Sequence, residues 1–270
     1  MNNSQQKPFL RWAGGKTWLL KNISSFLPDS FNNYHEPFLG GGSVFFYLKP
    51  PNNSFLSDSN IELINAFQQI RDNVDTVISF LSTYTNTKTI YYRIRNSLSK
   101  NNVERAAQFI YLNRTSFNGI YRVNLKGEYN VPYGYNNYKI LYDFDLLRST
   151  SNALSSASLK ICDFYKSIQR IKKDDLVFLD PPYTASHIKN GFIKYNEKLF
   201  SWQDQERLAL YIEEIKKIGA FYLMTNAKHE SVEDLYSKYD MPIVLNRFST
   251  IGGKNAKRSS INELLFTNVK

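Results

Sequence analysis

The most informative feature of this chain is the tetrapeptide Asp180-Pro181-Pro182-Tyr183, which directly follows an apolar run at 176–179. A short apolar run with sharp ends predicts a buried strand, and open α/β sheets bind ligands beyond the carboxyl ends of their strands. Proline has no backbone N–H, so the tetrapeptide offers mainly hydrogen-bond acceptors beside the flat ring of Tyr183. This arrangement suits the exocyclic amino group of a planar base, although an ordinary turn explains the same residues without a ligand.

A second group of candidate residues follows three other predicted strands. The glycine run at 40–42 comes after a strand and before a helix, so the backbone there can approach a ligand at a helix N-terminus. Asp58 ends the next strand, where an acceptor for a ribose hydroxyl is expected. Asp163 ends a third strand and would accept a hydrogen bond from an adenine amino group, with Phe164 against the ring. Each feature alone also fits a turn or a helix cap, but together they predict a pocket for an adenosine-bearing ligand.

The segment Trp12-Ala13-Gly14-Gly15-Lys16-Thr17 is the third candidate. Its Gly-Lys-Thr ending resembles a phosphate-binding P-loop, but Leu10 occupies the position of the required first glycine, which argues against ATP. The glycine run at 40–42 also lacks the G-x-G-x-x-G spacing, which disfavours a nicotinamide cofactor. We expect Trp12 to cover a ligand, with core packing as the alternative, and Lys16 to contact that ligand from the start of a helix.

Positive charge is concentrated in the middle of the chain. The formal net charge is +10, and between positions 88 and 139 nine basic residues are opposed only by Glu104 and Glu128. Tyrosine and phenylalanine side chains are interleaved with these basic residues, a combination typical of a nucleic-acid-binding surface. A basic surface without such a role is the alternative.

The elements that must position these residues follow two patterns. Strands and helices alternate at both ends of the chain, whereas 61–117 contains only amphipathic helices and 118–139 predicts a hairpin or extended loop. We therefore expect an α/β domain interrupted by a basic helical insert. The expected strands are 33–38, 54–57, 159–163, 176–180, 221–225, 243–249 and 262–267. The expected helices are 16–27, 43–48, 62–71, 74–84, 91–99, 103–116, 142–154 and 203–218, the last with a capping box of Ser201 and Asp204.

Composition excludes several functional classes. The sequence has no long apolar run and no cleavable leader, so a soluble, cytoplasmic protein is expected. The single cysteine, Cys162, cannot form an internal disulfide and lies in an apolar stretch, which indicates a buried structural thiol rather than a nucleophile. His35, His187 and His229 lack metal-ligand spacing, so no metal site is expected.

Three motifs occur in an order that resembles a known family. The segments 9–16 and 36–42 and the tetrapeptide at 180–183 resemble the signature motifs of Dam-type DNA adenine-N6 methyltransferases, the alpha group of the D12 class. The insert is similar as well, notably in Tyr111-Leu112-Asn113-Arg114 and in Tyr129-Asn130-Val131-Pro132. The C-terminal segment 258–265 is also similar to EcoRV-type modification methylases.

The resemblance implies a Rossmann-like S-adenosylmethionine-dependent methyltransferase sheet with an inserted helical target-recognition domain and a β-hairpin. The catalytic domain would comprise 1–60 and 148–270, and the inserted DNA-binding domain would comprise 61–147. The implied activity is site-specific transfer of a methyl group from S-adenosylmethionine to N6 of a flipped-out adenine in double-stranded DNA. The setting would be a bacterial or phage-infected bacterial cell, and a monomer is expected.

The same resemblance implies roles for individual residues. The catalytic residues would be Asp180, Pro181, Pro182 and Tyr183. The residues that bind S-adenosylmethionine would be Trp12, Lys16, Phe38, Gly40, Asp58, Asp163, Phe164 and Asp180. The residues that contact DNA would be Arg11, Arg95, Arg114, Phe117, Asn118, Ile120, Arg122, Asn124, Pro132 and Tyr135.

The implied chemistry uses the acceptors of the tetrapeptide. The lone pair of adenine N6 is delocalised into the ring, so hydrogen bonds from its two hydrogens to Asp180 and to the Pro181 carbonyl would free that lone pair for attack on an activated methyl group. The base must leave the duplex to be reached, and it would then stack on Tyr183. Arg122 would read a guanine. Tyr135 stands where many relatives have arginine, so the implied site is GATC or a longer site that begins with GAT.

Two other functions stay open at this point. Asp-Pro-Pro-Tyr-type motifs also serve methyltransferases that act on RNA or on a protein glutamine, and a non-catalytic DNA-binding protein could retain the same fold. The basic helical insert argues against the first, and the intact Asp180 and Tyr183 argue against the second. A restriction–modification system and an orphan or phage methylase are both compatible with the sequence.

Overall fold

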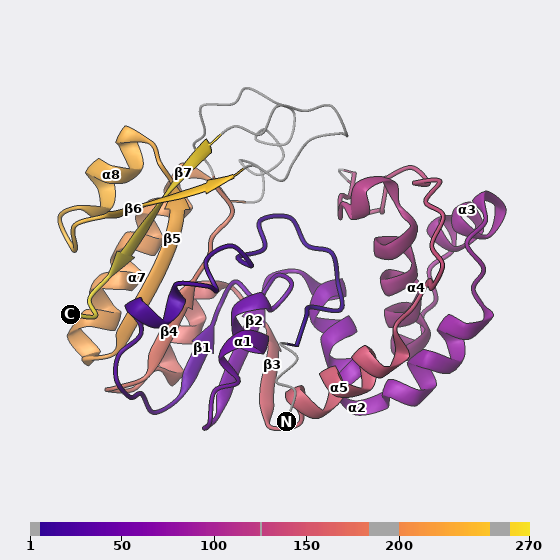
Figure 1. The fold of residues 1–270 in the computed structure, drawn as a ribbon, viewed down its shortest axis with the longest axis horizontal. Helices are drawn as coiled ribbons and strands as arrows, with labels where there is room; N and C mark the ends of the chain where they lie inside the picture. The colour runs from indigo at the N-terminus through magenta and orange to yellow at the C-terminus, as the bar shows by residue number, and fades with distance from the viewer. Residues whose placement is uncertain (1–5, 125, 184–199, 249–259) are drawn as a thin grey trace. The chain divides into compact units, whose positions relative to one another are not determined.

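The computed structural model describes residues 6–124, 126–183, 200–248 and 260–270 (Figure 1). Within these ranges seven strands form one sheet in the order β3-β2-β1-β4-β5-β7-β6. The strands are β1 (Tyr34–Glu36), β2 (Ser54–Asp58), β3 (Ala157–Ile161), β4 (Leu176–Leu179), β5 (Phe221–Ala227), β6 (Ile243–Phe248) and β7 (Ser260–Thr267). The α-helices are α1 (Ser43–Leu48), α2 (Ile61–Thr83), α3 (Lys88–Asn96), α4 (Asn102–Thr115), α5 (Phe144–Leu154), α7 (Trp202–Ile218) and α8 (Glu230–Tyr236). Short 3-10 helices are η1 (Ile23–Phe26), η2 (Phe117–Gly119) and η3 (Phe164–Arg170).

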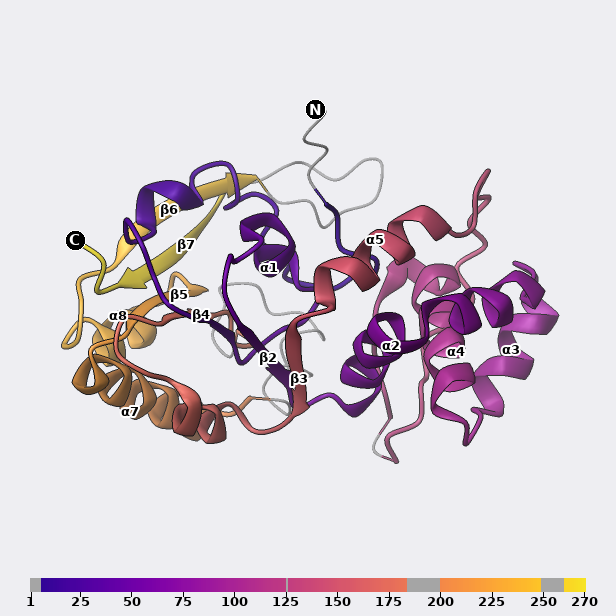
Figure 2. The same cartoon turned by 90° about the horizontal axis from the view of Figure 1, so that it is seen from below.

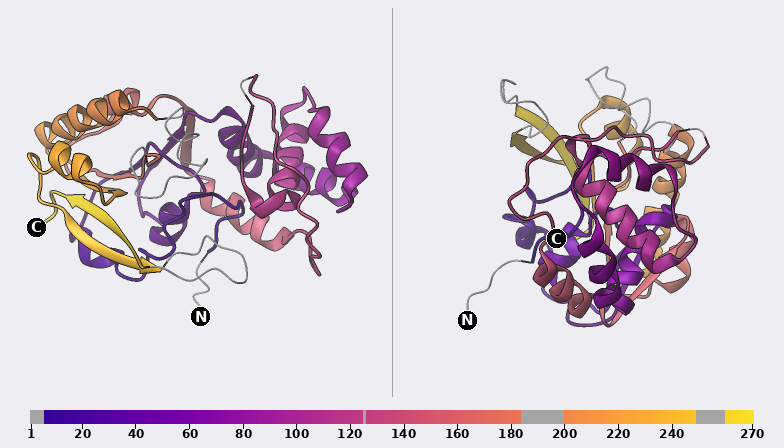
Figure 3. Two further views of the ribbon diagram at one scale, coloured as in Figure 1. Left: turned by 90° about the horizontal axis from the view of Figure 1, so that it is seen from above. Right: turned by 90° about the vertical axis from the view of Figure 1, so that its right-hand side faces the viewer.

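The middle of the sheet is parallel and one end is antiparallel. β4 pairs in parallel with both β1 and β5, whereas β7 runs antiparallel to β5 and to β6. β6 and β7 lie side by side as a twisted pair (Figure 3). The strand order changes direction between β1 and β4. Open α/β sheets bind ligands beyond the carboxyl ends of the strands at such a position. The Rossmann-like α/β fold expected from the sequence is therefore confirmed.

The chain divides into two compact units. The first unit comprises Met1–Thr17, Leu39–Pro51 and Leu56–Ile161, and the second comprises Trp18–Phe38, Asn52–Phe55 and Cys162–Lys270. The predicted insert at 61–147 falls within the first unit, and its boundaries as a recognition domain stay a prediction. None of the helices within the described ranges has the length and apolar character needed to cross a membrane.

Helix α7 of the second unit begins and ends at strong local signals. The Ser201 hydroxyl accepts from the Asp204 amide, and the Asp204 carboxylate accepts from the Ser201 amide, which is the predicted capping box. Gly219 ends the helix at φ +82°, a conformation that favours glycine. α7 lies along one face of β4 and β5 (Figure 2). Each fully buried aliphatic side chain of this layer contributes roughly 1.5–3 kcal/mol. The buried side chains of α7 include Leu208, Ile212 and Ile215, beside Val177, Leu179 and Tyr222 of the sheet.

The helices of the first unit pack on one another. α2 contacts both α4 and α5, and α3 contacts α4 (Figure 2). Asparagine side chains cap two of these helices: Asn60 accepts from the Leu63 amide, and Asn101 accepts from the amides of Val103 and Glu104. The fully buried side chains of α2 and α4 include Leu63, Ile64, Phe67, Ala106, Ala107 and Tyr111.

Three expected helices differ from the structure. The segment 16–27 forms turns and only the 3-10 helix η1, because Asn22 leaves helical geometry (φ −119°, ψ 1°) and Leu27, which precedes a proline, is extended. Leu19, Leu20 and Ile23 are nevertheless buried without an α-helix. The helices expected at 62–71 and 74–84 are one element, α2, kinked at Asn73 (φ −141°, ψ 35°). The short helix α8, which is capped by His229, has no counterpart among the helices expected from the sequence.

Three further expectations are narrowed or corrected, or fall outside the described residues. The segment 118–139, expected to be a hairpin or an extended loop, is a loop in its described residues. Isolated bridges join Ser116 with Tyr133 and Val123 with Tyr129, and the backbone is held mainly by turns and side chains. Cys162 follows the end of β3 and is partly exposed rather than buried. His187 and the C-terminal motif residues at 258–259 lie outside the described residues.

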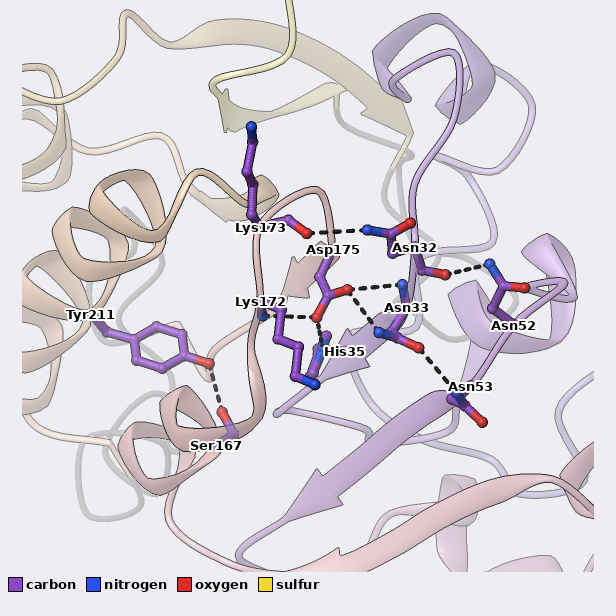
Figure 4. Close-up of polar contacts among 10 residues, drawn as sticks. All are labelled: Asn32, Asn33, His35, Asn52, Asn53, Ser167, Lys172, Lys173, Asp175 and Tyr211. Atoms are coloured by element: carbon purple, nitrogen blue, oxygen red, sulfur yellow. Dashed lines mark hydrogen bonds and ion pairs between the residues drawn. The ribbon is translucent and has the colours of Figure 1, made fainter.

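A buried polar hub joins the amino ends of β1 and β4 in the second unit (Figure 4). Asp175 is fully buried, and its carboxylate accepts from the backbone and side-chain amides of Asn33, both at 2.9 Å, and from the Lys172 amide at 2.9 Å. His35 Nε2 lies 2.8 Å from the same carboxylate, and the ring stacks on Phe55. His35 Nδ1 is buried and has no hydrogen-bond partner among the described residues. The hub fixes where both strands enter the sheet.

We expect His35 to make stability depend on pH. Burial lowers the pKa of His35 below its ordinary value, although Asp175 opposes the shift. The unfolded chain therefore binds this proton more readily, so the stability is fully present above about pH 6.5 and is lost as the pH falls. The free energy of unfolding in urea should decrease from about pH 8 to about pH 5.5 more steeply for the wild type than for His35→Gln, which keeps a donor for Asp175. Parallel pH profiles would contradict this role.

Candidate functional site

Asp180 leaves the carboxyl end of β4 beside the buried strand β5. The parallel register pairs Leu179 with Met224, so the next residues along the two strands are Asp180 and Thr225. Thr225 is fully buried, and its hydroxyl donates to Asp180 Oδ1 at 2.9 Å. The carboxylate is therefore held in orientation by a side chain from the neighbouring strand. Thr225 was not among the predicted site residues, because only the strand pairing brings it to Asp180.

Tyr183 is held by a residue from the far end of the chain. Its hydroxyl donates to Glu263 Oε2 at 2.6 Å, and Glu263 is only 2% exposed. Burial raises the pKa of Tyr183 well above its ordinary value, and the charges of Asp180 and Glu263 raise it further. The phenol is thus neutral and acts as a donor. The resemblance included Glu263 in a C-terminal motif but gave it no role.

A buried amide network continues from the end of β5 into the helices behind it. Asn226 donates to Gln205 Oε1 at 3.1 Å, and the Tyr236 hydroxyl lies 2.7 Å from the same oxygen. Gln205 and Asn226 are fully buried. Since these residues come from β5, α7 and α8, the network fixes the strand end that carries Thr225 against both helices.

The aromatic residues expected near an adenine gather in the second unit. Phe38 stacks on Phe164 with ring centroids 5.2 Å apart and meets Phe200 edge-on at 5.6 Å. Asp163 caps η3 by accepting from the Tyr165 amide, and its Oδ1 also accepts from Arg207 at 2.8 Å. The structure therefore brings Phe38 and Phe164 into contact, while Asp163 accepts from protein donors; their predicted role in cofactor binding stays a prediction.

The glycine turn of the first unit is organised by Asp58. The Gly40 amide donates to Asp58 Oδ2 at 3.1 Å and the Asn60 amide donates to Oδ1 at 2.9 Å. Burial raises the pKa of Asp58, while these amides lower it. Gly40 has φ +50°, and a Cβ there would lie 2.8 Å from Trp12 Cδ1. Only glycine fits at this position, because Trp12 packs directly on the turn.

Trp12 and Lys16 are both engaged within the first unit. Trp12 stacks on Tyr121 with centroids 5.5 Å apart and planes inclined by 22°, so its indole contacts both the glycine turn and the insert. Lys16 is 2% exposed, its ammonium donates to the Gly14 carbonyl at 2.8 Å, and its amide donates to the Ser43 hydroxyl at 3.2 Å. Ser43, the first residue of α1, was not predicted to take part.

Asn113 connects the N-terminal segment with the insert, and the sequence analysis gave it no role. Its Oδ1 accepts from the Arg11 amide at 2.9 Å, and its Nδ2 donates to the carbonyls of Arg11 and Gly119 at 2.8 and 3.3 Å. Gly119 has φ +64°, and a Cβ there would lie 2.5 Å from Arg11 Cδ. The backbone of Arg11 is therefore fixed against the turn after α4.

Two of the predicted DNA-contacting arginines flank one aromatic ring. The guanidinium carbons of Arg11 and Arg114 lie 5.4 and 4.2 Å from the ring centre of Tyr138. Arg114 also donates to the Leu141 carbonyl at 3.0 Å. Burial lowers the pKa of Arg114, and the like charge of Arg11 lowers it further. Such a pair of oriented guanidiniums suits an anionic ligand.

The predicted reading residues lie on the turns of the insert. Phe117 is 52% exposed and Tyr135 is 67% exposed. Asn118, between Phe117 and the buried Gly119, has a left-handed backbone with φ +57°. The Phe117 amide donates to the Pro132 carbonyl at 2.9 Å, which joins the two turns. Both aromatic side chains therefore stand at the surface on turns whose backbone is hydrogen-bonded.

The other predicted contacts of the insert have protein partners. Arg122 donates to Asn130 Oδ1 at 2.8 Å. Arg95 lies over Tyr92 and donates to the Val131 carbonyl at 3.2 Å. The side chain of Asn124 closes its own turn by accepting from the amides of Lys126 and Glu128. Ile120 is partly exposed, and its carbonyl accepts from Tyr129. Asn124 thus shapes the loop that presents the exposed Arg122.

The structure groups the predicted residues by unit. Asp180, Tyr183, Phe38, Phe164 and Asp163 belong to the second unit, and the remaining binding residues belong to the first. Within the described parts of the chain no cluster of three or more His, Cys, Asp or Glu side chains could hold a metal ion.

Comparison with known proteins gives matches over nearly the whole chain. A family model described as D12 class N6 adenine-specific DNA methyltransferase matches residues 12–250. The Type II methyltransferase M1.LlaDCHI of Lactococcus lactis subsp. cremoris is 37% identical, over 99% of this chain and 97% of its own length. The DNA adenine methylase of Haemophilus influenzae is 36% identical, over 97% and 93% respectively. The Type II methyltransferase M.MjaIII of Methanocaldococcus jannaschii is 35% identical, over 97% and 99%.

The Asn113 clamp predicts a measurable loss of stability. Asn113→Ala removes three hydrogen bonds and leaves buried backbone groups unsatisfied, so the free energy of unfolding should fall by about 1–3 kcal/mol. Asn152→Ala replaces an exposed asparagine on α5 and should change this free energy by less than about 0.5 kcal/mol. Chemical denaturation of both variants tests the clamp, and equal midpoints would argue against it.

Proposed function

The chain belongs to the D12 class of N6 adenine-specific DNA methyltransferases, and on that premise we propose that it methylates a flipped-out adenine within a short specific site in duplex DNA. The methyl donor would be S-adenosylmethionine. The observation that supports this proposal best is the state of Asp180, which lies at the carboxyl end of β4 with one oxygen held by Thr225. A carboxylate fixed at this edge of the sheet is suited to accept a hydrogen bond from an amino group.

The proposed reaction depends on positioning and hydrogen bonding. Asp180 and the Pro181 carbonyl would accept the two N6 hydrogens, which biases N6 toward tetrahedral geometry and frees its lone pair. The cofactor supplies an activated methyl group on a sulfonium. The residues of the site would orient N6 toward that methyl group, so most of the rate enhancement would come from orientation. The methyl–sulfur bond would break as the nitrogen–carbon bond forms, the bonding pair would stay with sulfur, and one N6 proton would leave to solvent. Tyr183 would stack on the base once it has left the helix.

The residues proposed to bind the cofactor fit an adenosine-bearing molecule. The turn at Gly40 is close-packed against Trp12 and is held by the Asp58 carboxylate. Such a turn with an acid on the following strand is suited to a nucleoside. Asp58 would accept hydrogen bonds from its ribose hydroxyls. The full set proposed to bind S-adenosylmethionine is Trp12, Lys16, Phe38, Gly40, Asp58, Asp163, Phe164 and Asp180.

The insert is proposed to bind and read DNA. Arg11 and Arg114 would contact phosphates, since both guanidiniums share the Tyr138 ring. Phe117 and Asn118 would fill the gap that the flipped base leaves, which explains why an aromatic side chain is kept 52% exposed. Arg122 would contact a guanine, because bidentate pairing of arginine with guanine is the commonest specific contact.

The site and biological context are proposed from the relatives. Two of the three relatives described are named type II methyltransferases and one is named a DNA adenine methylase. We propose a GATC site or a longer site that begins with GAT, methylated one strand at a time by a monomer in the cytoplasm. A restriction–modification role and an orphan or phage role would both use the same reaction.

The first test is to map methylated bases. Expression in a methylation-deficient host, followed by long-read sequencing of modified bases, should show N6-methyladenine in one short motif. An Asp180→Ala variant should show none, because the N6 acceptor is gone. A soluble wild-type protein that binds S-adenosylmethionine but marks no adenine would contradict the proposal and would favour RNA or a protein glutamine as acceptor.

The phosphate contacts predict a salt effect. Arg11→Ala and Arg114→Ala should each weaken duplex binding and reduce the slope of log affinity against log salt by about 0.9. Lys217→Ala is the matched control, because Lys217 lies on α7 and pairs with Glu213 and Glu214. Fluorescence anisotropy with a labelled duplex at several salt concentrations measures the slopes. Unchanged slopes in both arginine variants would remove them from the interface.

A further inference from the structure

Tyr183 is fixed through its hydroxyl rather than through its ring alone. The hydroxyl donates to Glu263 Oε2 at 2.6 Å, within the range of a short, charge-assisted hydrogen bond. Tyr183 itself is partly exposed, whereas Glu263 is 2% exposed. The buried carboxylate of Glu263 therefore orients the partly exposed side chain of Tyr183.

The fold explains how Glu263 reaches this position. β7 is antiparallel to β5, and Glu263 pairs with Ala227 at the carboxyl end of β5. Thr225, two residues earlier on β5, holds Asp180. Two adjacent strands thus each supply one polar side chain to the Asp180–Tyr183 tetrapeptide: β5 supplies the donor to the acid and β7 supplies the acceptor of the phenol.

Glu263 places a carboxylate in the interior next to buried apolar side chains, which costs free energy unless the carboxylate is hydrogen-bonded. Leu264, Leu265 and Phe266 follow it on β7 and are fully buried. Burial of a charge without adequate hydrogen bonds is strongly unfavourable. The neutral phenol of Tyr183, whose pKa is raised by burial and by both neighbouring acids, satisfies this carboxylate as a donor.

We propose that Glu263 is a positioning residue for methyl transfer, because it fixes the orientation in which the Tyr183 ring receives the target base. The proposal rests on the proposed function, in which Tyr183 stacks on the flipped adenine. A ring held by its hydroxyl presents a preformed stacking face, so no rotational freedom is lost when the base arrives. The effect is on orientation of the bound base and hence on the chemical step, with little effect on duplex affinity.

The test compares two substitutions of Glu263 with a matched control. Glu263→Leu removes the acceptor, whereas Glu263→Gln keeps an oxygen that can accept from Tyr183. Asp240→Leu is the control: Asp240 accepts from the Tyr222 hydroxyl at the same distance, 2.6 Å, and Tyr222 lies near the start of β5, away from its carboxyl end. All three variants are measured for thermal midpoint, single-turnover methylation rate, KM for duplex, and fluorescence of 2-aminopurine at the target position.

We expect Glu263→Leu to lower the single-turnover rate by about 10–100-fold, the size of effect produced by a small misplacement of reacting groups. KM for the duplex should change by less than about threefold, since the insert makes the phosphate contacts. The 2-aminopurine signal should be brighter than in the wild type, because the extruded base stacks less firmly. Glu263→Gln should recover most of the rate, and Asp240→Leu should keep the wild-type rate even where its thermal midpoint falls.

Two outcomes would overturn the inference and one concerns the proposed function instead. Equal rates for Glu263→Leu and Asp240→Leu, or a Gln variant as slow as the Leu variant, would show that Glu263 does not act through Tyr183. If Glu263→Leu fails to fold, Glu263→Gln and Tyr183→Phe replace it in the test. Tyr183→Phe keeps the ring but removes the hydroxyl that binds Glu263, so it should show the same loss of rate. A wild-type enzyme without adenine methylation would reject the proposed function before the variants are compared.

Discussion

The parallel register between β4 and β5 is the constraint on which the candidate site depends. It pairs Leu179 with Met224 and so sets Asp180 beside Thr225. A slip of one residue would turn every side chain of β4 to the opposite face and remove Asp180 from its donor. The register is protected at the other end of the same strand, where Asp175 binds Asn33, Lys172 and His35. The strand is therefore fixed at its entrance by a buried hub and carries the acid at its exit.

Buried polar side chains from distant parts of the sequence hold the candidate functional residues in place. Glu263 binds Tyr183 across 80 positions, and Asn113 binds the backbone of Arg11 across 102 positions. Glu263 and Asn113 are both nearly fully buried, so removing the partner of either one leaves a polar group without a hydrogen bond in the interior. This cost makes the arrangement specific. An alternative packing that separates the two partners loses more free energy than one that separates two apolar side chains of the same size. The accessible residues can remain exposed because their supports are buried.

The insert shows the same division between support and exposure. Tyr129 and Tyr133 are buried beneath the turns and donate to the carbonyls of Ile120 and Asn86. Phe117 and Tyr135 lie on those turns and remain exposed. A loop without a continuous β-ladder is thus held by tyrosine hydroxyls, asparagine side chains and left-handed residues at Asn118 and Tyr135. Such a scaffold holds exposed side chains in defined positions, as the proposed recognition of DNA requires.

The sequence by itself determined the α/β class, the family, the helices α1 and α7, the capping box at Ser201 and the acid at the mouth of β4. These features depend on local periodicity, capping and contiguous motifs, which are encoded within a few neighbouring residues. Only the tertiary structure decided that the segment 16–27 would form no α-helix and that Asp163 would bind Arg207. It also decided which buried side chains hold the candidate residues: Thr225 holds Asp180, Glu263 holds Tyr183, and Asn113 holds the backbone of Arg11. The physical reason is that strand pairing and side-chain hydrogen bonds join residues whose separation in the chain carries no local signal.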